Sequence, residues 1–191
     1  MKKFKPLGKS GPNRLTWIYY HMMLGLINEI DQESDDEKIK QKTVLCIFLA
    51  VNLIETFINS YFRLIAEKIN DPVKKSKLIL EINKEGLEWK VKNWPFLKEI
   101  DYGQGTGQRF IKLKDLRNGL MHYKPTYEKV RTFDGEVEGL TDTKIYDHLE
   151  KDQAVDFLAI VEDFIGEILR FNIKGVNQYG LGFWLGKVSK E

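Results

Sequence analysis

The sequence predicts an all-α fold, a helical bundle built on one long central helix. Apolar residues recur mostly at spacings of three and four instead of alternating, which is the period of an amphipathic helix. The segment 36–69 contains no Pro or Gly, so nothing in it interrupts a helix. A chain of 191 residues can bury about two-thirds of its unfolded surface in one domain but is short for two cores. We therefore expect one domain over 1–191, with its core at about 36–171.

The first helix is expected at about 14–31. Asn13 or Thr16 supplies a side chain that can cap its N-terminus, and a polar turn at 31–37 follows it. Its apolar residues share one helical face: Leu15, Ile18, Tyr19, Met22, Met23, Leu26, Ile27 and Ile30. This face is expected to pack on the core.

The second helix is expected to run over 36–69 and to be the spine of the domain. Unbroken, it would span about 50 Å at 1.5 Å per residue. Its middle is apolar on nearly every face, so it should be central or contribute to a dimer interface. Its longest uninterrupted apolar run, Val44 to Val51, is far shorter than the roughly twenty residues of a membrane helix, so no membrane span is expected.

Three further elements follow in the middle of the chain. Asp71-Pro72 supplies a cap and a Pro at the first helical position, which predicts a third helix to about Lys92. A fourth helix is expected from Thr106 or Gln108 to His122, before Pro125. Residues 124–146 contain an Asp-Gly pair between short β-prone pieces, which predicts a loop or a small hairpin.

The last helix is expected at 147–171, with an apolar face toward the core and acidic residues toward water. The tail, 172–191, contains Gly at four positions around Phe183 and Trp184. We expect this tail to be irregular and to be docked by its aromatic side chains.

The net charge of +2 conceals two opposite blocks. Residues 68–131 carry fifteen Lys and Arg against eight acids, whereas residues 132–167 carry eleven acids against two Lys. Two interpretations stay open. The blocks are either two solvated helix surfaces, or a basic surface that attracts phosphates beside an acidic segment that shields it or pairs with a partner.

Composition and spacing exclude several classes of protein. A single cysteine, Cys46, cannot form an internal disulfide, and the first thirty residues lack the apolar core of a signal peptide. A cytoplasmic setting is therefore expected. The glycine-rich loop 103–107 lacks the spacing of a dinucleotide or phosphate-binding loop. His21, His122 and His148 lie on three different elements, so we expect neither a metal nor a cofactor.

The end of the fourth helix carries the only residues that suggest chemistry. Asn118 and His122 are four residues apart and share a helical face, and Arg117 is long enough to swing toward it. A His can move protons near neutral pH, and an Arg can hold a phosphate and its developing charge. Such a pair suits phosphodiester cleavage. In the alternative interpretation, His122 stabilises the helix C-terminus and Arg117 forms a salt bridge to Glu55 or another acid.

The long helix carries a polar stripe within its apolar middle. The stripe consists of Asn52, Glu55, Thr56 and Asn59. Buried polar groups cost free energy unless they are paired, so the stripe needs partners, and Arg117 is the natural one for Glu55. A polar seam that only fixes the helix register is the alternative.

At these residues the sequence resembles the HEPN superfamily (higher eukaryotes and prokaryotes nucleotide-binding domain). The resemblance rests on Arg117-Asn118-x-x-x-His122, late in an all-α domain whose long early helix carries a polar stripe. It implies a metal-independent endoribonuclease, in which the RNA 2′-hydroxyl attacks the adjacent phosphate and leaves a cyclic phosphate. On that model His122 is the acid and base, Arg117 neutralises the phosphate, Asn118 orients one of them and Glu55 positions Arg117.

The resemblance also implies a homodimer, with the Arg and His of two protomers facing one cleft. Many such proteins act in toxin-antitoxin or other defence systems, which makes an antitoxin a candidate partner. Lys112, Lys114 and Lys124 are expected to bind the RNA. The chain departs from the toxin subgroup, in which a Tyr lies two positions after the His, because Lys124 occupies that position here.

A function of a different class is the alternative. The acidic block 132–167 and the aromatic tail are also typical of a non-catalytic helical module that binds a protein partner or RNA. The sequence leaves both functions open.

Overall fold

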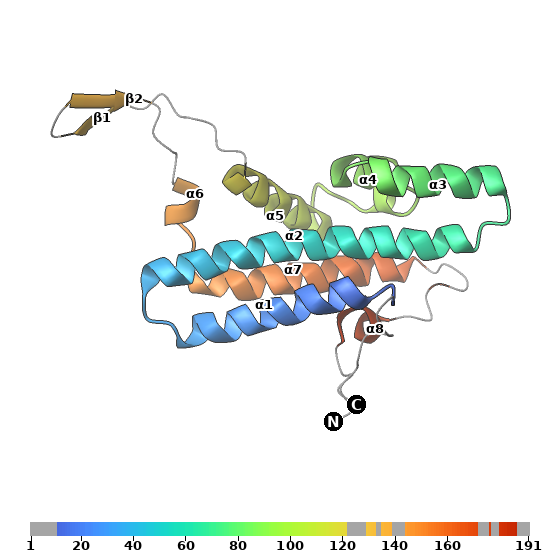
Figure 1. Cartoon of the computed structure of the whole chain (residues 1–191), viewed down its shortest axis with the longest axis horizontal. Helices are drawn as coiled ribbons and strands as arrows, with labels where there is room; N and C mark the ends of the chain where they lie inside the picture. Colours follow the sequence, from blue (N-terminus) through green and yellow to red (C-terminus); the bar gives the residue numbers. More distant parts are fainter. Residues whose placement is uncertain are drawn as a thin grey trace.

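Three long helices form the centre of the computed structural model (Figure 1): α1 (Arg14–Gln32), α2 (Asp36–Glu67) and α7 (Lys151–Arg170). The structure describes residues 11–121, 129–132, 135–138, 144–171, 176 and 180–186. Helix α1 runs antiparallel to α7. The Tyr20 hydroxyl donates to Glu162 (2.6 Å) at one level, and Lys151 Nζ donates to the Asp31 carbonyl (2.9 Å) at the other end of the pair. The predicted all-α bundle with a long central helix is confirmed.

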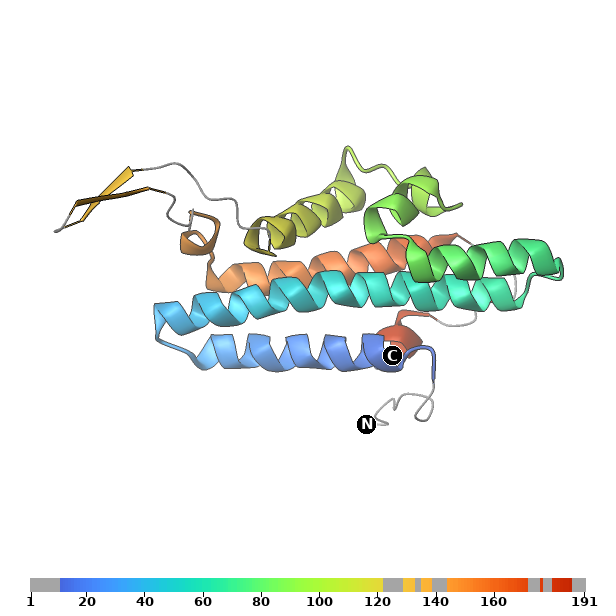
Figure 2. The same ribbon diagram turned by 45° about the horizontal axis from the view of Figure 1, so that its top comes forward.

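The remaining elements surround this centre. They are α3 (Pro72–Lys84), α4 (Leu87–Asn93), the 3₁₀ helix η1 (Leu97–Glu99), α5 (Gly105–Met121), β1 (Lys129–Thr132), β2 (Gly135–Glu138), α6 (Lys144–Asp147) and α8 (Leu181–Leu185). Figure 2 shows α1 and α5 on opposite sides of the pair formed by α2 and α7. The strands pair antiparallel, with Val130 opposite Val137, so the hairpin expected within 124–146 is confirmed.

Helix α2 is the spine of the core, as the sequence predicts. Twelve of its residues are buried, in agreement with the apolar character of its middle. Burial also raises the pKa of the Cys46 thiol to about 12, which fits a packed and unreactive cysteine. By length and hydropathy α2 is apolar enough to cross a membrane, although its longest uninterrupted apolar run is short. About half of that apolar stretch is buried inside the bundle.

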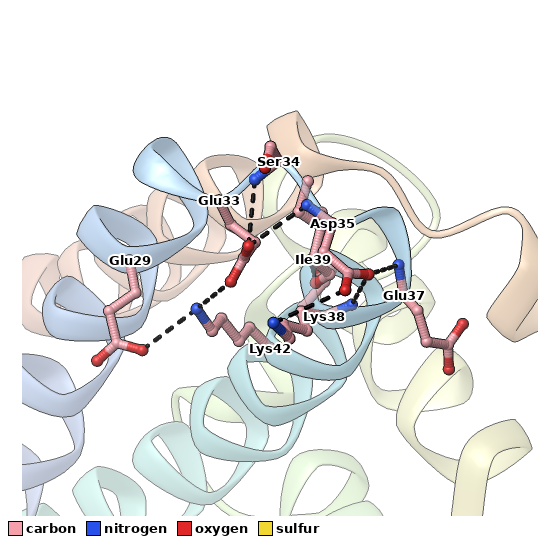
Figure 3. Close-up of polar contacts among 9 residues, drawn as sticks. Glu29, Glu33, Ser34, Asp35, Glu37, Lys38, Ile39 and Lys42 are labelled. Atoms are coloured by element: carbon pink, nitrogen blue, oxygen red, sulfur yellow. Dashed lines mark hydrogen bonds and ion pairs between the residues drawn. The ribbon is translucent and has the colours of Figure 1, made fainter.

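The turn between α1 and α2 is held by carboxylates (Figure 3). Asp35 caps α2 by accepting two backbone N–H groups of the first turn, at 3.0 and 3.3 Å. Glu33 accepts the backbone N–H of Asp35, and its other oxygen takes a hydrogen bond from Lys42 Nζ at 3.2 Å. Glu29 also lies 3.5 Å from the same ammonium group. Chiefly because of the hydrogen bond between them, the pKa of Glu33 is lowered and that of Lys42 is raised.

The third helix ends earlier than predicted. Instead of continuing to Lys92, it ends at Lys84, and a separate helix α4 begins after Gly86. Gly86 adopts an extended conformation (ψ 165°), which turns the chain back toward α2. The break allows Lys90 of α4 to donate to the carbonyl of Ile82, one of the last α3 carbonyls without a partner inside its helix. The prediction was wrong because tertiary packing of α4 outweighs the local helical pattern.

The last helix begins later than predicted. A single short turn, α6, precedes it, and α7 starts at Lys151 rather than at 147. Leu149 between them is buried, and the Gln153 side chain accepts the backbone N–H of Glu150 at the start of α7. The break between α6 and α7 therefore allows Leu149 to pack in the core and Gln153 to cap the start of α7.

The C-terminal segment packs against the beginning of α1. Trp184 of α8 is fully buried, so docking of the tail by an aromatic side chain is confirmed, although 181–185 is helical rather than irregular. Asn13 precedes α1 but does not cap it with its side chain, which instead donates to the Phe183 carbonyl (2.7 Å). The Thr16 hydroxyl bonds the Trp184 carbonyl at 2.9 Å. Asn13 and Thr16, which the sequence suggested as helix caps, therefore attach α8 to the start of α1.

Candidate functional site

Helix α5 carries the candidate site and lies along α7. Phe110 stacks on Phe164 with ring centroids 4.2 Å apart, and Arg109 forms an ion pair with Asp163 at 2.9 Å. Near the start of α5, Gly107 is buried so close to the Asp101 carbonyl that a side chain there would overlap it. At its other end, Gly119 faces only the terminal methyl group of Ile145 in α6, an exposed side chain that can move. The tight backbone packing of α5 is therefore at Gly107.

Arg117 and Asn118 lie in the last turns of α5, and both are half-buried. Arg117 Nε is buried and has no hydrogen-bond partner in the part of the chain that the structure describes. Within the same described part, no carboxylate lies within ion-pair distance of the Arg117 guanidinium. A half-buried guanidinium that the described carboxylates leave unpaired favours the approach of an anion.

His122 and Lys124 lie outside the described residues, one and three positions after the end of α5. The structure therefore brings Arg117 and Asn118 together on one helix end. It gives no distance from either of them to His122, so the composite site expected from the sequence stays a prediction.

The expected pair between Glu55 and Arg117 is not formed. The cation with which Glu55 interacts is Lys90 instead, because the charge of the Glu55 carboxylate acts to raise the pKa of that lysine. Arg117 lies seven residues beyond Phe110, about 10 Å further along α5 toward the end of the bundle where α2 begins. Glu55 lies in the second half of α2. Helices α2 and α5 contact each other, but no hydrogen bond or ion pair joins these two side chains.

The polar stripe of α2 has a different partner from the one expected. Lys90, only 2% exposed, donates from Nζ to Asn59 Oδ1 at 2.7 Å. The same ammonium lies 5.5 Å from the centre of the Trp94 ring. Burial lowers the pKa of Lys90, and Glu55 and Glu85 partly oppose this effect. Within the stripe it is therefore Asn59 that anchors α4, whereas Asn52 is exposed and needs no partner inside the bundle.

Two of the lysines expected to bind RNA have different environments. Lys112 is exposed on α5, where an incoming phosphate can reach it. Lys114 is almost buried, and its ammonium lies 3.3 Å from Asp115 and 3.8 Å from Glu88 of α4. Chiefly through Lys92 and then through Lys114, the pKa of Glu88 is lowered. Lys114 thus connects α5 to α4, and only Lys112 keeps the expected exposure.

Sequence reasoning missed the buried lysine and the aromatic groove beside it. Leu87, Lys90 and Val91 lie at i, i+3 and i+4 and all three are buried, so the spacing alone placed Lys90 on the packed face. No comparable pattern marks the groove, which is formed by residues from three helices. Among the described residues, no group of three His, Cys, Asp or Glu side chains is arranged to hold a metal ion.

Comparisons with protein-family models, curated proteins and solved structures give no match to this chain.

Proposed function

We propose that the protein is a metal-independent endoribonuclease of the HEPN type. The observation that supports this most directly is Arg117, a half-buried guanidinium without an ion-pair partner in the described part of the chain, at the end of α5. Asn118 adjoins it, and His122 follows one position after the described helix. The three residues occur within the positive block of the sequence, 68–131, which favours a phosphate-bearing substrate.

In the proposed reaction the RNA 2′-hydroxyl loses its proton to a base and attacks the adjacent phosphorus. The bond from phosphorus to the 5′-oxygen breaks, and that oxygen takes up a proton, leaving a 2′,3′-cyclic phosphate and a 5′-hydroxyl. His122 is the residue proposed to move these protons, because imidazole titrates near neutral pH. Arg117 binds the phosphate and its developing charge. Asn118 orients either His122 or Arg117. Glu55 has no place in this proposal, because it forms no ion pair with Arg117.

The test is cleavage of single-stranded RNA in EDTA by the wild type and by Arg117→Ala and His122→Ala. The matched controls are Arg109→Ala, which removes an arginine of the same helix that pairs with Asp163, and His148→Ala. We expect cleavage with a cyclic phosphate end from the wild type and both controls, and none from the two test variants. Absence of cleavage by the wild type and both controls, or equal cleavage by all five proteins, would contradict the proposal.

We further propose that two copies of the chain complete the site, as the HEPN resemblance implies. Light scattering should then show a dimer, and specific activity should fall on dilution below the dimer dissociation constant. A monomer with undiminished specific activity would exclude a shared site while leaving the ribonuclease proposal standing.

The alternative is a non-catalytic interaction module that binds RNA or a protein such as an antitoxin. It is favoured by three exposed apolar side chains at the end of the bundle where α5 meets α6 and α7 begins: Met121, Ile145 and Val155. A co-purified protein that stays bound to Arg117→Ala and His122→Ala but is lost from Val155→Asp would support this function. Unchanged RNA cleavage by Val155→Asp, with no such protein, would exclude it.

A further inference from the structure

A groove between α2, α3 and α4 has an aromatic lining and a basic rim, and it involves no residue of the candidate site. Its volume is about 480 Å³. The residues that matter for its chemistry are Phe62, Lys74, Lys77, Trp89, Trp94 and Phe96. In Figure 1 α3 and α4 lie over the second half of α2, away from the end of α5 that carries Arg117.

The base of the groove is a fixed pair of stacked rings. Phe62 and Trp94 are both buried, and their centroids are 4.2 Å apart at an interplanar angle of 29°. Trp94 Nε1 donates to Glu81 Oε2 at 3.0 Å, which holds the indole in place. Trp89 differs from this pair because it is 36% exposed at the groove. The groove thus offers an accessible indole beside a rigid apolar base.

The far wall is formed by a residue in a strained conformation. Phe96 has a φ of 69°, in the left-handed region that a side chain other than Gly rarely occupies. Its ring packs against Phe171, with centroids 5.6 Å apart, and this contact helps to hold the conformation. The chain after Pro95 is therefore directed so that a fourth aromatic side chain lines the groove.

The rim of the groove is positively charged. The Lys74 and Lys77 side chains are 78% and 77% exposed. Their ammonium groups lie 3.9 Å from the carboxylates of Asp71, which caps α3, and of Glu81. Exposed ion pairs at that distance are weak, so both ammonium groups can bind an incoming anion. Residues 68–100 carry eight lysines and five acids, which adds a positive field around the groove.

We propose that this groove binds single-stranded nucleic acid, with a base stacked on Trp89 and backbone phosphates paired with Lys74 and Lys77. Aromatic stacking surfaces beside cations are the means by which proteins hold unpaired strands, since every base has an apolar face and every phosphate a charge. An acidic helical peptide is the other ligand of matching charge. Such a peptide could pack on Ile65, Ile69 and Leu78, which also line the groove, but it has no planar group to stack on the exposed indole of Trp89. The inference extends the proposed function by giving the substrate strand a second contact, but its test does not depend on cleavage.

The experiment is fluorescence anisotropy of labelled oligouridine, oligoadenylate and oligothymidine with the full chain carrying Arg117→Ala, so that no substrate is consumed. Trp89→Ala removes the stacking surface, and the double variant Lys74→Ala/Lys77→Ala removes the rim charges. Leu80→Ala and Lys84→Ala are matched controls, because both residues are on α3 but do not line the groove. Circular dichroism checks that each variant keeps its helices.

We expect about tenfold weaker binding from Trp89→Ala, at the scale of one stacked base. The double lysine variant should bind more weakly, with the slope of log affinity against log salt reduced by about 1.4, the value for two phosphates of a single strand. Both controls should bind as the Arg117→Ala protein does. If oligothymidine binds as tightly as the RNAs, the groove reads the base and phosphate and not the sugar, and the inference stands.

Two results would overturn the inference. The first is equal affinity in Trp89→Ala, in the double lysine variant and in the controls. The second is absence of oligonucleotide binding together with tight binding of an oligoglutamate peptide that depends on Trp89. Failure of the ribonuclease proposal would be distinguishable, because cleavage would then be absent while binding to the groove persisted.

Discussion

Lys90 and Asn59 are joined by a hydrogen bond of 2.7 Å between α4 and the second half of α2, and the lysine that makes it is buried. The ammonium also bonds the Ile82 carbonyl at the end of α3. One side chain therefore connects three helices around the break at Gly86. This connection positions Trp89 and Trp94, and with them the wall of the aromatic groove.

Lys90→Met should destabilise the protein by about 1–3 kcal/mol, because it keeps the aliphatic stem but leaves the Asn59 amide oxygen and the Ile82 carbonyl without a donor. Lys90→Ala should cost about 2 kcal/mol more through lost burial of the stem. Urea denaturation followed by circular dichroism measures both. Lys92→Ala, on the exposed side of the same helix, should stay within about 0.5 kcal/mol of the wild type. Equal stability of Lys90→Met and Lys92→Ala would contradict the bridging role.

The lowered pKa of Lys90 predicts a pH dependence at the alkaline end. The folded state releases the Lys90 proton at a lower pH than the unfolded chain, whose lysines titrate near about 10.4. Between the two pKa values the unfolded chain binds more protons, so this group makes stability rise with pH in that window. The difference in unfolding free energy between the wild type and Lys90→Met should therefore grow in favour of the wild type as pH increases toward 10.4. A difference that is flat with pH would show that Lys90 titrates normally.

The turn between α1 and α2 predicts a pH dependence of stability at the acidic end. The pKa of Glu33 is lowered by its hydrogen bond from Lys42, so its stabilising effect is complete above the pKa of an unfolded Glu, about 4.3. It is lost as pH falls through the lower folded pKa. Glu33→Gln should reduce the melting temperature at pH 7 and match the wild type below that folded pKa. Gln41→Ala on α2, which is exposed, is the control, and a gap between wild type and Glu33→Gln that persists in strong acid would contradict the prediction.

Much of the fold follows from short-range patterns in the sequence. The absence of Gly and Pro over 36–69 and the apolar stripe of α1 are local features, and the helices they predict are present, with α2 ending at Glu67. The break after Lys84 is different, since its cause is the long-range contact of Lys90 with Asn59, which no local pattern contains. The late start of α7 has the same kind of cause, because it follows from burial of Leu149.

The candidate site was predictable only in part. The sequence identified Arg117 and Asn118 as neighbours at a helix end, and the structure places them there. It paired Glu55 with Arg117 by chemical type alone, and charge complementarity cannot tell how far α5 slides along α2. The lysine in the same positive block that meets the polar stripe is Lys90. Lys114 is also positive, but its ion pairs with Asp115 and Glu88 give it a structural role.

Two glycines of the bundle should respond oppositely to substitution by alanine. A Cβ at Gly107 would overlap the Asp101 carbonyl and crowd Ile100, so Gly107→Ala should destabilise by about 1–3 kcal/mol and displace the start of α5. Gly25 lies in the middle of α1 with open space around it, so Gly25→Ala should stabilise by about 0.5–1 kcal/mol. Thermal unfolding of the two variants decides the matter. A shift of the same sign for both would show that the contact at Gly107 relaxes easily.

The ribonuclease proposal makes a kinetic prediction for Arg117 that a structural arginine would not meet. If the guanidinium binds charge that develops during attack on phosphorus, Arg117→Ala should lower kcat by about 100-fold or more and change KM much less. Arg117→Lys should recover only part of this loss, because an ammonium group keeps the charge but not the two-pronged hydrogen bonding. Arg109→Ala should leave kcat unchanged, since Arg109 pairs with Asp163 on the surface of the bundle. Steady-state kinetics with a fluorogenic single-stranded RNA, together with melting temperatures of all three variants, separates these cases. A fall in kcat that follows the fall in melting temperature, and that Arg109→Ala shares, would assign Arg117 to folding instead of chemistry.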